Sequence, residues 1–174
     1  MEKRTGNRCG LALYIVAITF GLSVCPLAAQ TGAWTAVAST GAIDPSSLNS
    51  YDFAGYNLLH RYLAVDDVIA HYNVTNTFGG GITDRPSWTT LELTSWDNSP
   101  TSYVMATLFR IRSCTGTVER VCDVTGRDGL ENSCNTCKFQ PDTFDFSNSL
   151  YYVEIRIHRD KPDIGPMAIG LRIY

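Results

Sequence analysis

Histidine is scarce in this chain of 174 residues, and its three copies stand far apart at His60, His71 and His158. No two of them have the i, i+4 spacing of a helical zinc site, and no H-E-x-x-H motif occurs. The sequence also lacks a G-x-S-x-G nucleophile motif and a phosphate-binding loop. Glu92 and Glu154 lie on polar strand faces, where isolated glutamates usually serve solubility alone. These absences predict that the protein is not an enzyme.

The sequence also has no excess of positively charged residues. The chain carries 14 Lys and Arg residues against 17 Asp and Glu residues, which gives a formal net charge of −3. A mildly acidic chain lacks the basic surface typical of nucleic-acid binders. It also has no Lys and Arg cluster of the size that holds a protein on an anionic membrane. We therefore expect no nucleic-acid partner.

The longest uncharged apolar run is too short to span a bilayer. It extends from Gly10 to Val24, which is 15 residues, whereas a membrane-spanning helix needs about 20. A basic start precedes the run, and Pro26 with the small residues Ala28 and Ala29 follows it. This order is typical of a secretory signal peptide, which we assign to residues 1–29. An uncleaved membrane anchor is the alternative.

Removal of the signal peptide leaves residues 30–174, which fit one domain. The net charge of this part is about −5, and it holds four of the six cysteines. We expect the mature protein to be secreted, periplasmic or attached to the cell surface, with no membrane insertion after processing. Such compartments are oxidising, so disulfides are expected to form and persist.

Helical periodicity is also hard to find after residue 30, whereas period-two alternation is common. In the segment 150–160, Tyr151, Val153, Ile155 and Ile157 fall on one face, and polar side chains fall on the other. This pattern predicts a strand with one buried and one solvent-facing side. The fold class that we predict is all-β: a single antiparallel β-sandwich or jelly-roll-like domain after the signal peptide.

The remaining strands are predicted in the same way. We expect them at 34–39, 68–78, 88–96, 103–112, 118–125 and 168–174. In the last of these, Ile169, Leu171 and Ile173 are expected to point inward. Residues 50–62 remain ambiguous, because 51–59 also fit a short helix.

The four remaining cysteines are spaced C-x7-C-x11-C-x2-C. The Asp128-Gly129 dipeptide is a strong turn signal, and a hairpin folded there would place Cys122 opposite Cys134. This geometry favours the nested bridges Cys122–Cys134 and Cys114–Cys137. The alternative pairing is Cys114–Cys122 with Cys134–Cys137.

Metal and redox roles for these cysteines are disfavoured. Structural zinc sites usually show two short C-x2-C pairs, and only one is present here. A thioredoxin-like centre needs a βαβ setting that the sequence does not show. A structural calcium ion is possible, because acidic residues crowd the cysteine segment at Asp123, Asp128 and Glu131, but no D-x-D-x-D-G pattern identifies its ligands. We assign no other cofactor.

Aromatic residues are the one plentiful functional resource, at 11% of the chain. Most of them are expected in the core, where a large ring buries about 150–250 Å². Trp88 and Trp96 stand at the two ends of one predicted strand, next to loops, and are the weak candidates for ligand binding.

The sequence therefore predicts an exported, non-enzymatic β-sandwich that acts as a binding or surface-interaction module. One alternative is a carbohydrate-binding, lectin-like module, and the other is a structural subunit of a cell-surface assembly. The corresponding partners are a glycan or another surface protein.

The signal-peptide assignment predicts a mature N-terminus near Gln30. Intact-mass measurement of the exported protein should give the mass of residues 30–174. An exported protein that keeps residues 1–29 would instead support the membrane anchor.

Overall fold

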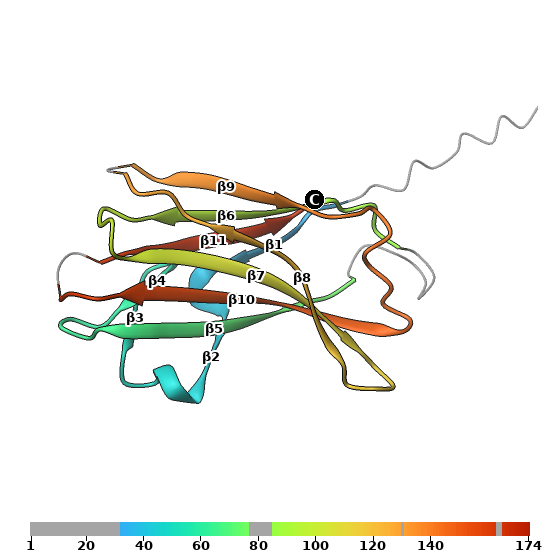
Figure 1. Cartoon of the computed structure of the whole chain (residues 1–174), viewed down its shortest axis with the longest axis horizontal. Coiled ribbons are helices and arrows are strands. Elements are labelled where there is room, and N and C mark those ends of the chain that lie inside the picture. The colour runs from blue at the N-terminus through green and yellow to red at the C-terminus, as the bar shows by residue number, and fades with distance from the viewer. Residues whose placement is uncertain (1–31, 77–84, 130, 163–164) are drawn as a thin grey trace, which may run out of the picture.

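The computed structural model describes residues 32–174 apart from 77–84, 130 and 163–164. The predicted signal peptide and the last two residues of the predicted strand 68–78 lie outside the described residues. The described part folds into two packed antiparallel sheets and two short 3-10 turns, η1 (Ala38–Thr40) and η2 (Pro45–Ser47) (Figure 1). This arrangement confirms the predicted all-β sandwich. None of the described segments forms a helix with the length and apolar character needed to cross a bilayer.

The first sheet has six strands. They are β1 (Trp34–Val37), β3 (Tyr51–Ala54), β4 (Asn57–His60), β6 (Thr90–Trp96), β9 (Ser133–Lys138) and β11 (Met167–Ile173). Their order is β3-β4-β11-β6-β9, and β1 pairs with β11 on the same side as β4.

The second sheet has five strands. They are β2 (Ala42–Ile43), β5 (Asp66–Val74), β7 (Tyr103–Arg112), β8 (Val118–Thr125) and β10 (Ser149–Arg159). Their order is β2-β5-β10-β7-β8, so β10 lies in the middle of the sheet.

The core lies between the sheets and follows the predicted alternation. On β10 the inward set of Tyr151, Val153, Ile155 and Ile157 is buried, with no side chain more than 3% exposed. The neighbouring strands β5 and β7 bury alternate residues in the same way. Burial of a Leu, Ile or Val side chain contributes about 1.5–3 kcal/mol, so this shared apolar layer holds the two sheets together.

A buried tyrosine on β5 requires a glycine on the neighbouring segment. The Tyr72 hydroxyl donates a hydrogen bond of 2.6 Å to the Ala38 carbonyl, and burial raises the pKa of Tyr72. A Cβ atom at Gly41 would lie 2.5 Å from the Tyr72 ring. Gly41 therefore leaves the space into which the ring packs.

The inward set predicted for β11 is wrong at one position. The pairing of β11 with β6 shifts between Ala168 and Gly170, so Ile169 is the extra residue of a β-bulge. Ala168 is fully buried in its place, and Ile169 is half-buried. A bulge inserts one extra residue into one strand of a pair. Beyond the bulge, the order of inward and outward side chains along that strand is therefore reversed.

The ambiguous segment 50–62 forms a hairpin and not a helix. β3 and β4 pair from Tyr51 with His60 to Ala54 with Asn57, which leaves a two-residue turn at Gly55 and Tyr56. Gly55 has a φ of +65°. Glycine at the first central position is the signature of a type II′ hairpin turn.

The predicted cysteine pairing is also wrong. The structure contains a Cys122–Cys137 disulfide with a Cα–Cα distance of 6.1 Å, and it leaves Cys114 and Cys134 free and exposed. The nested pairing assumed that β8 and β9 form a hairpin, but β8 pairs with β7 and β9 pairs with β6. The disulfide therefore joins the edge strands of two different sheets.

The alternative C-x2-C ring is ruled out by strand geometry. Cys137 pairs with the buried Leu91, whereas Cys134 pairs with Thr94. Residues three apart on a strand point to opposite faces of its sheet. The two sulfur atoms are thus separated by the sheet itself.

This pairing predicts two titratable thiols in the mature chain, in both native and denatured protein. Cys137→Ser should lower the free energy of unfolding by about 2–4 kcal/mol, because it removes the cross-link. Cys134→Ser, which removes a thiol outside the core, should change it by less than about 0.5 kcal/mol. Thiol titration with Ellman's reagent and urea unfolding measure these quantities, and a count of zero thiols would contradict the pairing.

Candidate functional site

The two predicted tryptophan candidates differ in exposure. Trp88 is 1% exposed, and its indole Nε1 donates a hydrogen bond of 2.8 Å to the Gly32 carbonyl. Its ring meets Phe144 edge-on at 5.0 Å between centroids. Trp88 is therefore a core residue, and its ring has no face open to a ligand.

Trp88 belongs to an aromatic cluster that closes one end of the core. Phe144 and Phe146 stack on each other at 5.6 Å, and both contact the Tyr151 ring. The Tyr151 hydroxyl donates to the Thr143 carbonyl at 2.7 Å, which ties the loop before β10 to the cluster. Trp96 lies elsewhere, half-buried at the end of β6 beside Met167. It stays a candidate for ligand binding.

The outer side of the five-stranded sheet gathers side chains that the sequence did not single out together. They come from β5, β7 and β10, and they combine rings with charged groups. We call this surface the charged aromatic face; its members are Asp67, His71, Tyr103, Phe109, Tyr152, Glu154, Arg156 and His158.

Two stacked ring pairs lie on this face. Tyr103 stacks on His158 with centroids 5.0 Å apart and planes at 21°. Phe109 stacks on Tyr152 at 5.0 Å and 17°, and both pairs join residues that are direct neighbours across β7 and β10. Cross-strand aromatic pairs of this kind stabilise a sheet and hold their rings in place.

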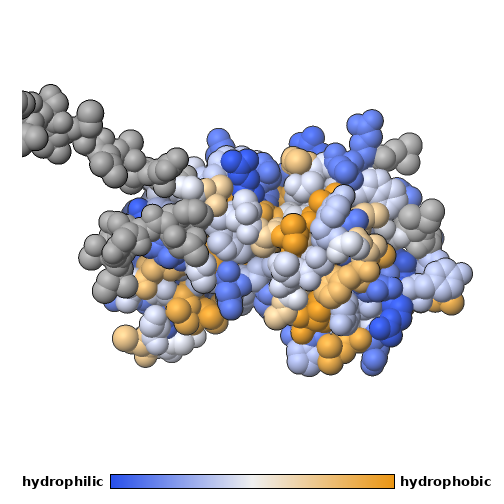
Figure 2. All heavy atoms as spheres, turned by 180° about the vertical axis from the view of Figure 1, so that it is seen from behind, coloured by the Kyte–Doolittle hydropathy of each residue, from blue (hydrophilic) through white to orange (hydrophobic). Residues whose placement is uncertain are grey.

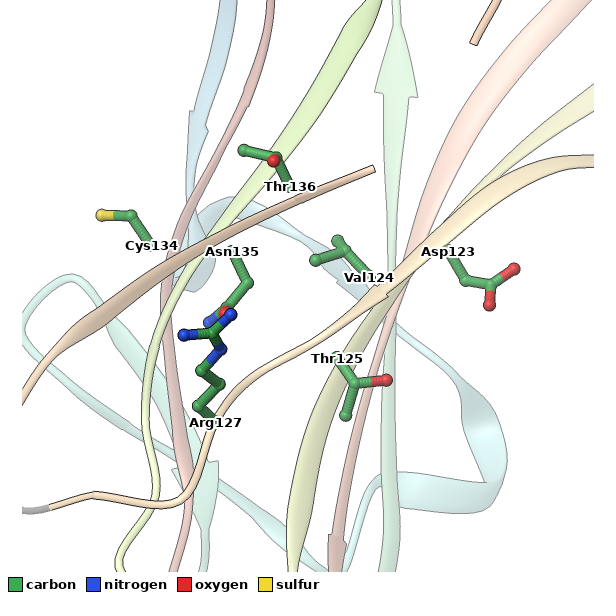
Figure 3. A pocket seen from close by; sticks show the side chains of 7 residues that line it. All are labelled: Asp123, Val124, Thr125, Arg127, Cys134, Asn135 and Thr136. Carbon is green, nitrogen blue, oxygen red and sulfur yellow. The ribbon is translucent and has the colours of Figure 1, made fainter. Parts of the chain in front are cut away.

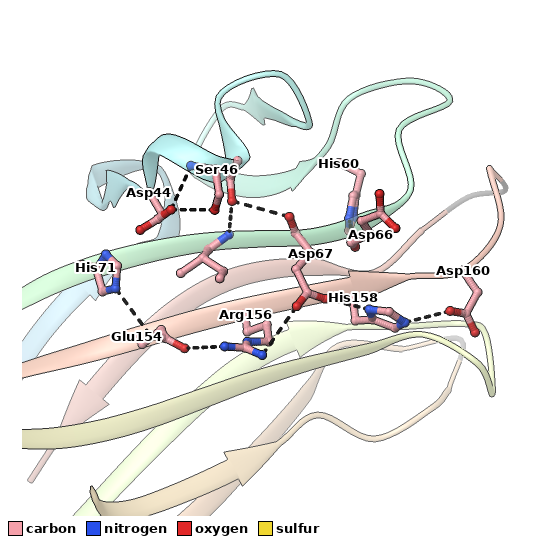
Figure 4. Close-up of polar contacts among 12 residues, drawn as sticks. Asp44, Ser46, His60, Asp66, Asp67, His71, Glu154, Arg156, His158 and Asp160 are labelled. Atoms are coloured by element: carbon pink, nitrogen blue, oxygen red, sulfur yellow. Dashed lines mark hydrogen bonds and ion pairs between the residues drawn. The ribbon is translucent and has the colours of Figure 1, made fainter. Parts of the chain in front are cut away.

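A chain of ion pairs runs along the same face (Figure 4). Glu154 contacts His71 at 3.4 Å and Arg156 at 3.3 Å. Arg156 also lies 3.5 Å from Asp67, which in turn contacts Nδ1 of His158 at 2.7 Å. Each member therefore has a partner that restricts its rotamers.

His158 is the terminal imidazole of this chain and lies between two carboxylates. Its Nε2 atom contacts Asp160 at 2.7 Å, opposite the Asp67 contact. The hydrogen bond to Asp67, and next that to Asp160, raise the pKa of His158 above its ordinary value of 6.5. The protonated form, in which both ring nitrogens donate, fits this geometry.

His60 shows the opposite behaviour. It is 3% exposed, and its Nε2 atom lies 2.9 Å from the Asp66 carbonyl. Its Nδ1 atom has no hydrogen-bond partner within the part of the chain that is described. Burial lowers the pKa of His60, because the charged ring would lose its hydration.

A polar cavity lies at the edge of the sandwich, between β8 and β9 (Figure 3). Its volume is about 410 Å³, and its lining includes Asp123, Arg127, Cys134 and Asn135. The side chains around it are mostly polar, and no ring lines it. It offers hydrogen bonds without an aromatic platform.

The described residues form no metal site that would support the calcium hypothesis. Within the described ranges, no group of three or more His, Cys, Asp or Glu side chains is arranged to hold a metal ion. Asp123, one of the acidic residues near the cysteines, pairs instead with Arg120.

The side of the molecule opposite to that in Figure 1 carries both hydrophobic and hydrophilic side chains. Figure 2 shows hydrophobic patches separated by hydrophilic side chains, without one continuous hydrophobic face among the described residues on that side. The exposed large hydrophobic residues include Phe53 and Tyr56 of the β3–β4 hairpin and Tyr62 and Leu63 after it. Exposed apolar side chains are common on protein surfaces.

The two histidines predict opposite pH effects, which NMR titration of their ring protons measures. His158 should titrate above 6.5, so its stabilising contribution is complete below 6.5 and is lost as the pH rises through its folded pKa. His60 should titrate below 6.5, so its contribution is complete above 6.5 and is lost as the pH falls towards its folded pKa. His158→Gln and His60→Gln assign the two signals. Equal titration of both rings would contradict the described contacts.

Among the comparisons with known proteins, the search of solved structures gave matches. No protein-family model and no curated protein matches the chain. Among solved structures, the chain is similar to one described as "xylan-binding module CBM15", with 15% sequence identity and a TM-score of 0.46. The similarity covers 82% of this chain and 95% of that one.

Proposed function

We propose that the mature protein is a non-catalytic carbohydrate-binding module of the cell exterior, which binds an extended polysaccharide on the charged aromatic face. The observation that carries the proposal is the presence of two stacked ring pairs and a fixed row of charged groups on one side of one sheet. The proposal selects the carbohydrate alternative among the three functions that the sequence allows.

The chemistry of this face suits a sugar chain. A pyranose ring presents C–H groups on its faces and hydroxyl groups around its rim. The C–H groups carry slight positive charge and are attracted to the negative faces of Tyr and Phe rings. The hydroxyl groups can donate to carboxylates such as Glu154 and accept from the guanidinium of Arg156, and such charge-assisted hydrogen bonds are stronger than neutral ones.

The spacing of the rings favours a chain over a single sugar. Tyr103 and Phe109 are six residues apart on β7, which corresponds to about 20 Å along the strand. One monosaccharide cannot contact both ring pairs over that length. A polysaccharide that lies along the sheet can reach both.

The ion-pair chain lowers the cost of binding. Ordering a long side chain on binding costs about 0.5–1.5 kcal/mol. The partners of Arg156, Glu154 and Asp67 already restrict these side chains in the unbound protein. More of the interaction energy is then left for the ligand.

Catalysis is not part of the proposal. Glu92 and Glu154, the glutamates predicted on polar strand faces, lie on β6 and β10, and so on different sheets. Both point away from the core, and Glu92 accepts a hydrogen bond of 3.3 Å from the Tyr174 hydroxyl. They cannot flank one glycosidic bond, as a pair of catalytic carboxyls must.

A structural role through strand addition is less well supported. The edge strand β8 carries Glu119, Arg120 and Asp123 along eight residues. Charged side chains on an edge strand are a common protection against pairing with another chain.

Binding should depend on Tyr152 and not on Trp96. Tyr152→Ala removes one ring of a stacked pair and should weaken polysaccharide binding about tenfold, which corresponds to about 1.4 kcal/mol. Trp96→Ala is the matched control, because it removes a half-buried ring from the other sheet. Pull-down with insoluble polysaccharides and affinity electrophoresis with soluble ones measure the effect, and thermal melts check that both variants fold.

Two outcomes would contradict the proposal. If no polysaccharide in a panel of plant, bacterial and fungal polysaccharides retains the parent protein, the proposed polysaccharide binding is excluded. Binding that is lost with Trp96→Ala and kept with Tyr152→Ala would place the site on the six-stranded sheet.

A further inference from the structure

A second cavity lies at the end of the five-stranded sheet, on the side opposite the charged aromatic face. Its volume is about 450 Å³. It is lined by Arg110 and Arg112 of β7, Cys114 and Thr115 of the following turn, and Asp145, Asn148 and Ser149 at the start of β10. Arg110 and Arg112 continue the inward series of Ala106 and Leu108, whereas Phe109 belongs to the outer series.

Two guanidinium groups share one carboxylate beside this cavity. Arg110 donates through Nε to Oε2 of Glu119 at 2.9 Å, and its Nη2 contacts the same oxygen. Arg112 donates through Nε to Oε1 of Glu119 at 2.7 Å. Hydrogen bonds from both arginines lower the pKa of Glu119, so the carboxylate stays ionised between them.

The nearby acidic group is already neutralised. Asp145 contacts Arg85 at 3.1 Å and accepts a hydrogen bond of 3.0 Å from the Asn148 amide. The cluster therefore contains three arginines, Arg85, Arg110 and Arg112, and two carboxylates, Glu119 and Asp145. One positive charge is left over, on a chain whose formal net charge is −3.

The surplus charge is most accessible on Arg112. Its side chain is 57% exposed, against 30% for Arg110; Arg85 is as exposed, at 56%, but one of its terminal nitrogens is paired with Asp145. Only its Nε atom is used by Glu119, and within the described part of the chain its two terminal nitrogens make no hydrogen bond. These two nitrogens form the end of the guanidinium group that binds a carboxylate or sulfate through two parallel hydrogen bonds.

We propose that this cavity is an oxyanion site, which binds the carboxylate of a uronic acid or the sulfate ester of an acidic polysaccharide. Arg112 makes the bidentate contact, Glu119 holds its guanidinium in position, and the hydroxyls of Thr115 and Ser149 supply neutral hydrogen bonds. The identity of the ligand as a polysaccharide rests on the proposed function. The contact between the cavity and an anion does not depend on it.

NMR titration of the arginine Nε–Hε signals tests the anion contact. The probes are sodium galacturonate and sodium sulfate, with galactose as the neutral sugar. We expect at least one of the two anions to shift the Arg112 signal, and galactose to leave it unchanged. Arg112→Gln should weaken binding of that anion at least tenfold, as expected for the loss of a charge-assisted pair.

Two further variants separate the bidentate contact from a general charge effect. Arg112→Lys keeps the charge but loses the planar fork, so it should also bind several-fold more weakly than the parent. Arg172→Gln is the matched control, because Arg172 is an exposed strand arginine on the six-stranded sheet, 4.7 Å from the centre of the Tyr174 ring. Arg112→Lys with parent affinity, or an equal loss with Arg172→Gln, would overturn the proposal.

Affinity electrophoresis then distinguishes the sources of the anion. Polygalacturonate that retards the parent more than Arg112→Gln identifies a uronate, and a sulfated galactan that does so identifies a sulfate ester. Neutral galactan should retard the parent and the Arg112→Gln variant equally.

Failure of this inference is distinguishable from failure of the proposed function. No Arg112 shift with either anion overturns the oxyanion site, whatever the binding of neutral polysaccharides. An Arg112 shift in a protein that no polysaccharide retains supports the anion contact and overturns the carbohydrate-binding function.

Discussion

The alternation of side chains on β10 fixes both the core and the candidate site. Ile155 and its inward neighbours fill the space between the sheets, while Tyr152, Glu154 and Arg156 point outward. A shift of one residue in register would bury Glu154 and Arg156 in place of apolar side chains. The cost of burying such charges is several kcal/mol per ion, which is comparable with the roughly 5–15 kcal/mol by which a domain is usually stable. Core packing therefore sets the geometry of the charged aromatic face.

Local sequence patterns predicted the strands well, because alternation is a property of a single segment. The predicted strand 118–125 agrees with β8, and the buried series of β10 is the one expected. The candidate site was not predictable in the same way. Its ring pairs join Tyr103 with His158 and Phe109 with Tyr152, and Asp67 comes from a strand still farther away in the sequence. Such neighbours depend on strand order, which no single segment specifies.

The wrong predictions have the same origin. The Cys122–Cys134 bridge followed from a local turn signal at Asp128-Gly129, but the chain passes from one sheet to the other there instead of forming a hairpin. Trp88 was a candidate for ligand binding because it stands next to a loop at the end of a predicted strand, and the Phe144 loop that covers it follows more than fifty residues later. The bulge at Ile169 is a local feature, but only its pairing with β6 reveals it. Gly55 could have identified the β3–β4 turn, since glycine at a two-residue connection is a local signal.

Among the described residues, the disulfide ties the sheets together along one long edge, through β8 and β9. At the opposite edge, the five-stranded sheet ends in β2, whose ladder contains two residue pairs with β5. Fluctuations that separate the sheets are therefore expected to begin on the β2 side. Asp67 and His71 of the charged aromatic face lie on β5, so a ligand that spans β5, β10 and β7 would favour forms in which β5 stays paired with β10. By mass action, its binding would suppress the detachment of β5 from β10, and occupancy of the face would be coupled to the order of the edge that lies farthest from the Cys122–Cys137 disulfide.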